Sequence, residues 1–369
     1  MKKTAAAFTI FCLLCFAPYA GAGEEESVYR IIDQSGQVLA HICGPCEAGD
    51  EYISASNAQY RISSVNEEAH TAEAEYTGMA NMPDISWLTG GEAQPVSAAA
   101  KRLIALYCTH SDESYIKGDG TESSENRGGI YDIADLFAGQ LKKLGTEVEL
   151  NTETHHPHDA GAYRRSRQTA LALLKQQPDA IFDLHRDGIP DPDEYAATVS
   201  GKEMSKVRLL VGKSNQNKDA NLSFAKKIKA VADRMYPGLI KDIYIGKGTY
   251  NQDLAPHSVL LEFGTHTLPK SRVEASVEPM AEVVYRTVFG GVVGSAGASD
   301  VSGNATDKEV QPLSESNEGS GAALWMIIAL IAGLGVFAFL SAGRRGGAEK
   351  WKHSFSEMTG GLLGKRPRR

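Results

Sequence analysis

The sequence predicts an α/β protein with a mostly parallel sheet that carries helices on both faces. Two observations support this prediction. Residues 98–290 alternate short apolar runs with amphipathic segments, and this alternation is typical of a parallel sheet. Several apolar runs also stop abruptly at polar residues, as buried strands do where they leave a sheet for a loop. We expect a small β module before this region and a transmembrane helix after it.

The elements of this region follow from the spacing of their apolar residues. Runs of four or five apolar residues predict buried strands, and apolar residues at 3.6 spacing predict helices. Gly145 directly after one such helix supplies its stop. The expected strands are 103–107, 147–150, 180–184, 207–211 and 259–263, and the expected helices are 130–144, 163–176, 221–235 and 274–289.

The preceding segment, residues 23–76, carries short strand-like runs separated by turn residues. Its expected strands are 28–32, 37–42, 51–53 and 59–62, with turns at Gln34–Gly36 and Ala48–Asp50. We interpret it as a small β module, and interpret 77–97, which contains Gly, Pro and Asn, as a linker. The module has no evident catalytic set.

Both termini indicate export and membrane attachment. Residues 1–22 combine Lys2 and Lys3, an apolar stretch and small residues, which is typical of a signal peptide, although an uncleaved anchor has the same features. After an acidic segment without periodicity at 291–321, predicted to be a disordered linker, residues 322–342 are uncharged and long enough to span a bilayer. The basic tail at 343–369 is then cytoplasmic by the positive-inside rule, and the body is extracytoplasmic.

Composition excludes some partners and limits the role of cysteine. The chain has 369 residues, of which 42% are hydrophobic, and a formal charge of −8 without a basic, aromatic-rich stretch in its middle, so we expect no nucleic-acid partner. Cys43-Gly-Pro-Cys46 resembles a thioredoxin-type redox motif, but no helix signal follows it. We expect a local disulfide there, and expect Cys108 to be a buried thiol.

Three strand ends carry residues suited to a metal site. His110 and Glu113 follow the first strand, His185 follows the strand at 180–184, and Glu262 lies in the strand at 259–263. Carboxyl ends of neighbouring parallel strands meet at one edge of a sheet, so we expect these side chains to converge. Two histidines and a carboxylate can hold Zn²⁺ with an open position for water, and a separate carboxylate can accept that water's proton. Alone, each residue also fits a structural role, such as a core histidine or a salt bridge between Glu262 and Arg186.

Several short sequence motifs in residues 103–284, and the order in which they occur, closely resemble those of the stage II sporulation protein P family of cell-wall amidases. The matching phrases are Tyr107-Cys-Thr-His-Ser-Asp-Glu-Ser-Tyr115, Asp183-Leu-His-Arg-Asp187, Tyr236-Pro-Gly-Leu239, Tyr250-Asn-Gln252 and Leu260-Leu-Glu-Phe-Gly264.

This resemblance implies a zinc-dependent N-acetylmuramoyl-L-alanine amidase that acts on peptidoglycan during engulfment in sporulation. It supports His110, Glu113 and His185 as ligands and Glu262 as general base, and we expect Arg186 to steady the developing oxyanion. Partners would then be peptidoglycan, the cytoplasmic membrane and further stage II sporulation proteins, D and M. Competing functions are a D,D-endopeptidase that cuts cross-links, a wall-binding protein without activity, and a thiol oxidoreductase centred on Cys43.

Several further residues are candidates for the site or depart from the family pattern. Glu125 is a second candidate for the carboxylate ligand, and His266 stands where the family usually has a different continuation. The membrane anchor after the catalytic region also departs from the family, which usually has it at the N-terminus. Further candidates for contact with metal or substrate are the histidines of Thr154–Asp159 and three arginines, Arg164, Arg165 and Arg167.

Overall fold

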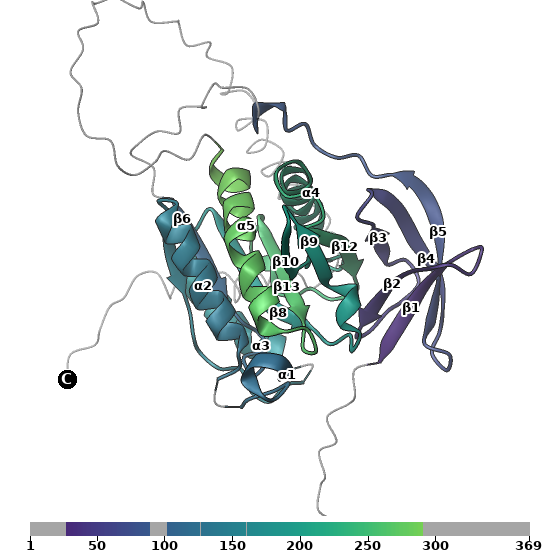
Figure 1. The fold of residues 1–369 in the computed structure, drawn as a ribbon, viewed down its shortest axis with the longest axis horizontal. Helices are drawn as coiled ribbons and strands as arrows, with labels where there is room; N and C mark the ends of the chain where they lie inside the picture. The colour runs from purple at the N-terminus through teal and green to yellow at the C-terminus, as the bar shows by residue number, and fades with distance from the viewer. Residues whose placement is uncertain (1–26, 89–101, 126, 160, 291–369) are drawn as a thin grey trace, which may run out of the picture. The chain divides into compact units, whose positions relative to one another are not determined.

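Eleven strands form one mixed sheet in the computed structural model, which describes residues 27–88, 102–125, 127–159 and 161–290 (Figure 1). The strands of this sheet are β1 (Val28–Asp33), β2 (Val38–Cys43), β3 (Glu51–Ile53), β4 (Ala58–Asn66), β5 (Thr71–Met79), β6 (Leu103–Tyr107), β7 (Glu147–Leu150), β8 (Ala180–Asp187), β11 (Val207–Gly212), β12 (Ile240–Gly246) and β13 (Ser258–Thr265). A separate hairpin contains β9 (Ala196–Val199) and β10 (Lys202–Ser205). The helices are α1 (Ile116–Asp119), α2 (Ile130–Lys143), α3 (Ala162–Leu174), α4 (Lys218–Met235) and α5 (Lys270–Phe289), with 3-10 turns η1 (Ser86–Leu88), η2 (Pro192–Glu194) and η3 (Gln252–Leu254).

The full sheet is mixed, although within residues 98–290 four of its five strand pairings are parallel, as predicted. Its order is β2-β1-β5-β4-β3-β12-β11-β13-β8-β6-β7. Strands β13, β8, β6 and β7 are parallel to one another, whereas β11 is antiparallel to β13. A parallel return requires a long crossover, usually a helix, but η2 and the β9–β10 hairpin connect β8 to β11. The chain therefore re-enters the sheet in the opposite direction.

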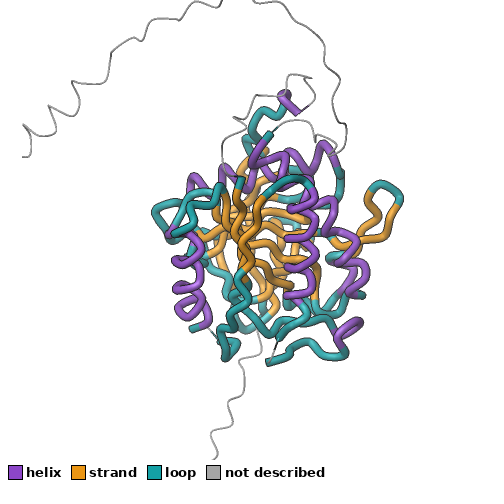
Figure 2. The backbone as a smooth tube through the Cα atoms, turned by 90° about the vertical axis from the view of Figure 1, so that its left-hand side faces the viewer, coloured by secondary structure: helices purple, strands orange, loops and turns teal. Residues whose placement is uncertain are grey.

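Helices lie on both faces of the sheet, as the sequence predicted (Figure 2). One face packs against α2, α4 and α5 through the largest apolar cluster, which contains Leu106, Phe182 and Leu261. The other face packs against α3 through a smaller cluster that contains Tyr107 and Ile181. Side chains alternate between the faces along each strand, so the two clusters share β6 and β8 without mixing.

The N-terminal strands continue the sheet and help to cover the face on which α3 lies. Strand β3 pairs antiparallel with β12, with Tyr52 opposite Tyr244. Apolar side chains of β1 and β2 pack in one cluster with Leu210 of β11 and Leu260 of β13. The predicted β module is therefore part of the same structural unit, and β5 extends to Met79, into the segment predicted as a linker.

Some predicted segments lie outside the described residues: the signal peptide, residues 89–97 of the first linker, the linker at 291–321, the transmembrane helix at 322–342 and the tail at 343–369. Of the helices that the structure does describe, none is both long and apolar enough to cross a membrane.

The predicted disulfide between Cys43 and Cys46 is wrong. Cys46 is a buried thiol and is not joined to Cys43. It packs in the N-terminal apolar cluster beside Tyr244, and burial there raises its pKa to about 11. Cys108 is a buried thiol, as predicted.

The pairing of β3 with β12 generates a prediction about truncation. A chain limited to residues 98–290 loses this pairing and the apolar cover of Leu210 and Leu260, so it should be less stable than residues 27–290. We expect its Tm to fall by roughly 5 °C or more, because 1 kcal/mol corresponds to about 2–4 °C in domains of this size. Calorimetry of both chains measures this. Equal Tm values would show that the N-terminal strands form an independent module.

Candidate metal centre

The adjacent parallel strands β13, β8 and β6 bring the predicted site residues together. His110 and Glu113 lie in the loop after β6, and His185 lies in β8. Glu262 of β13 is the register partner of His185. Partners in register on neighbouring strands are about 4.8 Å apart and point to the same face, so Glu262 lies beside His185.

Main-chain contacts to the start of α2 fix the loop that carries His110 and Glu113. The N–H of Gly128 donates to the carbonyl of Ser111 at 2.9 Å, and the N–H of Ile130 donates to the carbonyl of Glu113 at 3.0 Å. A Cβ atom on Gly128 would lie 2.3 Å from that Glu113 carbonyl, so only glycine permits this close approach. The loop conformation therefore depends on the helix start as well as on the strand before it.

Donor atoms of His110, Glu113 and His185 meet at one point. The Nδ1 atoms of His110 and His185 lie 3.1 and 3.2 Å from Oε1 of Glu113. One candidate ligand atom from each residue lies within 4.8 Å of the others. The side chains of His110, Glu113 and His185 are only 12%, 3% and 4% exposed.

These separations fit a zinc ion. Two tetrahedral ligands at about 2.0–2.2 Å from one zinc ion are roughly 3.4 Å apart, close to the distances between each histidine nitrogen and the carboxylate oxygen. Two imidazoles and one carboxylate are also a common protein ligand set of catalytic zinc, and they leave a position open for water. The residues present therefore fit the metal that the sequence predicted.

The charges around the cluster favour a cation. Burial alone would lower the pKa of His185, but the carboxylates of Asp183 and Glu113 raise it well above its ordinary value. Burial would raise the pKa of Glu113, but His185 and His110 hold it well below its ordinary value. Burial lowers the pKa of His110, which keeps this imidazole neutral, as a ligand must be. The carboxylates that stabilise a proton on His185 would also stabilise a divalent metal ion bound in place of that proton.

A second carboxylate lies beside the outer nitrogen of His185 as an ion-pair partner. Oδ1 of Asp183 lies 3.0 Å from Nε2 of His185, on the side of the ring away from Glu113. Asp183 is held in turn by the N–H and hydroxyl of Thr109, at 2.8 and 2.6 Å. Nε2 of His185 has no hydrogen-bond partner among the described residues, so Asp183 acts on the ring as a nearby negative charge that increases its basicity.

Glu262 lies in a network of buried charges beside the cluster. Its Oε2 atom accepts a hydrogen bond from the Tyr195 hydroxyl at 2.9 Å and lies 3.7 Å from Nη1 of Arg208. Burial and the charge of Asp187 raise the pKa of Glu262 well above its ordinary value, although Arg208 opposes this. Its side chain is 14% exposed, which keeps it accessible to a small molecule such as water.

The side chain of Arg186 points to the loop after β6. Its guanidinium donates to the main-chain carbonyls of Ser114, Asp187 and Glu122 at 3.0–3.5 Å. Its described contact with the site is through the main chain, because its N–H donates to Oε2 of Glu113 at 2.8 Å. The oxyanion role of Arg186 therefore stays a prediction that these contacts do not support.

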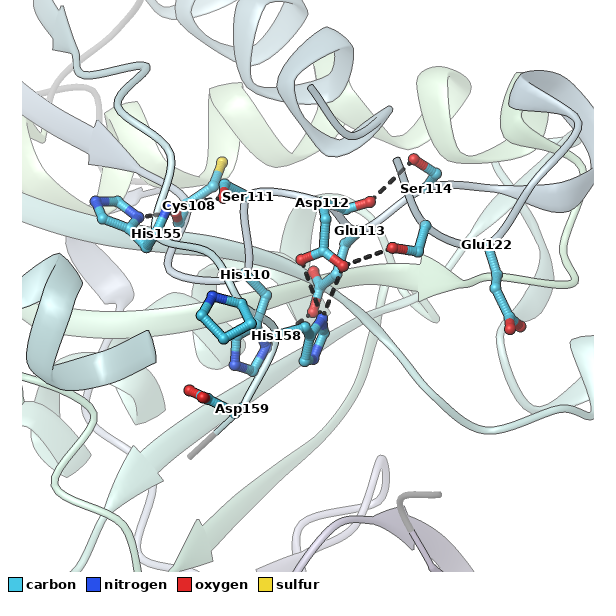
Figure 3. Close-up of polar contacts among 12 residues, drawn as sticks. Cys108, His110, Ser111, Asp112, Glu113, Ser114, Glu122, His155, His158 and Asp159 are labelled. Atoms are coloured by element: carbon cyan, nitrogen blue, oxygen red, sulfur yellow. Dashed lines mark hydrogen bonds and ion pairs between the residues drawn. The ribbon is translucent and has the colours of Figure 1, made fainter. Parts of the chain in front are cut away.

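The histidines of Thr154–Asp159 have different surroundings (Figure 3). His155 is buried and bonded to the carbonyl of Cys108 and to Thr169, which indicates a structural role. His158 stacks on His110 with ring centroids 3.9 Å apart and lies 3.1 Å from Oδ1 of Asp112. His158 is thus at the site, and its contact with substrate stays a prediction.

The remaining candidate residues lie away from the cluster or bind elsewhere. Glu125 is exposed, so Glu113 is the carboxylate that faces the histidines. Arg165 and Arg167 pair with Asp159 and Asp253, and Nε2 of His266 lies 3.8 Å from Oε2 of Glu122.

Sequence reasoning missed four residues around the site: Asp183, Asp187, Tyr195 and Arg208. The alternation of Asp183, His185 and Asp187 along a strand that begins with an apolar run was a usable signal, because it places all three on one face. Arg208 inside the apolar run of β11 was another. Tyr195 follows η2, and its contacts with Asp187 and Glu262 are purely tertiary, so no local pattern indicates it.

The cluster predicts which carboxylate is needed for metal binding. The parent chain should hold about one zinc ion, and Glu113→Gln should lose it because the negatively charged ligand is gone. Glu125→Gln is the matched control and should keep the metal, because Glu125 is exposed. Elemental analysis after dialysis measures the zinc content. Loss of zinc from Glu125→Gln, with retention by Glu113→Gln, would reverse the assignment.

Comparison with solved structures finds amidases at low similarity. An N-acetylmuramyl-L-alanine amidase of Mycobacterium abscessus is 17% identical, with 51% of this chain and 97% of that chain covered and a TM-score of 0.34. An N-acetylmuramoyl-L-alanine amidase of Nostoc punctiforme is 15% identical, with coverages of 52% and 96% and a TM-score of 0.35. TM-scores this low do not establish a shared fold.

Comparison of the sequence with known sequences and family models gives stronger matches than comparison of the structures. Stage II sporulation protein P of Bacillus subtilis (strain 168) is 28% identical over 183 residues, which cover 44% of this chain and 45% of that protein. The chain thus matches less than half the length of this relative. The family model for stage II sporulation protein P matches residues 46–285, more than half of the 369 residues. The chain belongs to the stage II sporulation protein P family.

Proposed function

We propose that this protein is a zinc-dependent peptidoglycan hydrolase that cleaves the amide bond between the muramic lactyl group and L-alanine. The observation that carries the proposal is the position of a separate, partly buried carboxylate, Glu262, beside the cluster of His110, Glu113 and His185. A binding protein would need neither a metal cluster nor a neighbouring base. Membership of a sporulation family supports wall remodelling during engulfment as the setting.

The proposed chemistry divides into activation and proton transfer. Zinc, when bound at the cluster, supplies Lewis-acid activation of water and of the amide carbonyl. Glu262 accepts the proton of the attacking water and then passes it to the leaving amine of L-alanine. Because its pKa is raised, Glu262 is a stronger base than an exposed glutamate. Arg208, 3.7 Å away, favours the charged form that a base requires.

Location and partners complete the proposal. We propose that residues 23–321 lie outside the cytoplasmic membrane, that residues 322–342 anchor the chain, and that the basic tail is cytoplasmic. The substrate is peptidoglycan, and two further stage II sporulation proteins, D and M, are the proposed partners. A D,D-endopeptidase with the same metal is the second candidate function, because the cluster would activate water for either amide.

Digestion of purified sacculi tests both the bond and the base. The parent enzyme should release stem peptides with a free L-alanine amino group, which mass spectrometry detects, whereas an endopeptidase would leave the stems attached to muramic acid. Glu262→Gln should keep zinc and still bind sacculi but lose roughly 10²–10⁴ in rate, because the amide cannot accept the proton.

The exposed residue Glu274 of α5 supplies the matched control, since Glu274→Gln removes a charge outside the cluster and should keep the parent rate. Hydrolysis by Glu262→Gln at the parent rate would reject the proposed base. Binding of sacculi without any release of peptide by the zinc-loaded parent would favour a wall-binding protein.

A further inference from the structure

The hydroxyl of Tyr195 lies between two carboxylates at the candidate site. Tyr195 follows η2 and is completely buried. Its hydroxyl oxygen is 2.6 Å from Oδ2 of Asp187 and 2.9 Å from Oε2 of Glu262. One hydroxyl has one proton and two lone pairs, so it can donate to one carboxylate and accept from a protonated one.

Arg208 does not fix the orientation of the Glu262 carboxylate, because its hydrogen bonds go to other residues. Its Nε and Nη2 atoms bind Asp242 at 2.7 and 3.0 Å, and its Nη1 atom binds Asp187 at 2.7 Å. Nη2 also donates to the carbonyl of His41 at 2.8 Å. The 3.7 Å separation between Arg208 and Glu262 is an ion pair without hydrogen-bond geometry, so it favours the charge of Glu262 without fixing the direction of its lone pairs.

We propose that Tyr195 is a positioning residue that holds the Glu262 carboxylate in the orientation needed for proton transfer. The inference rests on the proposed function, in which Glu262 is first charged and then protonated. The hydroxyl of Tyr195 can donate to Oε2 of Glu262 in both forms, because the proton taken from water is held on the other oxygen, Oε1, from which it passes to the leaving amine. Displacement of a catalytic group by about 1 Å can lower the rate of reaction by about 10²-fold. The hydrogen bond between Tyr195 and Glu262 should therefore affect the rate of hydrolysis.

The ring of Tyr195 is held independently of its hydroxyl. It lies 6.0 Å from the guanidinium carbon of Arg208 and 5.3 Å from Nζ of Lys241, as cation–π contacts. The preceding Glu194 is fixed by Lys241 at 2.6 Å and by His41 at 2.7 Å. Tyr195→Phe therefore keeps the ring, its neighbours and the main chain in place and removes only the hydrogen bonds.

A second buried tyrosine in the same sheet provides the matched control. Tyr244 of β12 is 1% exposed, and its hydroxyl donates to Oδ2 of Asp50 at 2.7 Å. Tyr244→Phe thus removes a buried tyrosine–carboxylate bond of the same kind, but one without contact to Glu262. Comparison of the two variants separates a general loss of stability from a specific loss of positioning.

The test measures kcat and KM on a soluble muramoyl peptide, together with zinc content and crystal structures of the zinc-loaded variants. Tyr195→Phe should lower kcat by roughly 10- to 100-fold, with KM within about twofold and zinc retained. The Glu262 carboxylate should be displaced in its crystal structure, while His110, Glu113 and His185 stay in place. Tyr244→Phe should lower Tm by a similar amount but keep the parent kcat.

A parent-like kcat in Tyr195→Phe would overturn the inference, and so would an equal loss of kcat in Tyr244→Phe. If the parent itself hydrolyses no muramoyl peptide, the proposed function fails, and the crystal structures then decide the inference alone. A displaced Glu262 carboxylate in Tyr195→Phe supports positioning by the hydroxyl, and an unchanged carboxylate rejects it.

Discussion

The alternation of side chains along β8 is the constraint on which the candidate site depends. Asp183, His185 and Asp187 all face the side of the sheet on which α3 and the N-terminal strands lie. Each has a different partner, because Asp183 supports the outer nitrogen of His185, His185 meets Glu113, and Asp187 binds Tyr195 and Arg208. A shift of one residue in the pairing of β8 would turn all three into the opposite apolar core.

The convergence of the site residues was predicted from the sequence, whereas the antiparallel direction of β11 was missed. Apolar runs that end at His110 and near His185 identify strand ends, and neighbouring parallel strands bring them together. Strand β12 escaped prediction because Lys241 and Asp242 interrupt its apolar pattern, although both are buried. The antiparallel direction of β11 follows from the missing crossover helix after β8, a signal that the residue pattern contained.

The buried charges around Arg208 explain why the N-terminal strands belong to the site. Arg208 pairs with Asp187 and Asp242 and donates to a carbonyl of β2, so strands from both ends of the described chain satisfy one guanidinium. Removal of one partner from a buried charge pair typically costs about 3–5 kcal/mol, because the remaining charge is left uncompensated. Such contacts between distant segments arise only from the tertiary fold, which is why the sequence indicated Glu262 but not its neighbour Tyr195.

Anomalous diffraction at the zinc absorption edge, from crystals of the zinc-loaded protein, tests the central claim most directly. We predict one peak about 2.0–2.2 Å from a nitrogen of His110, a nitrogen of His185 and an oxygen of Glu113, with the carboxylate of Glu262 nearby but outside the ligand sphere. A peak coordinated directly by Glu262, or no peak among these residues at full zinc loading, would contradict it.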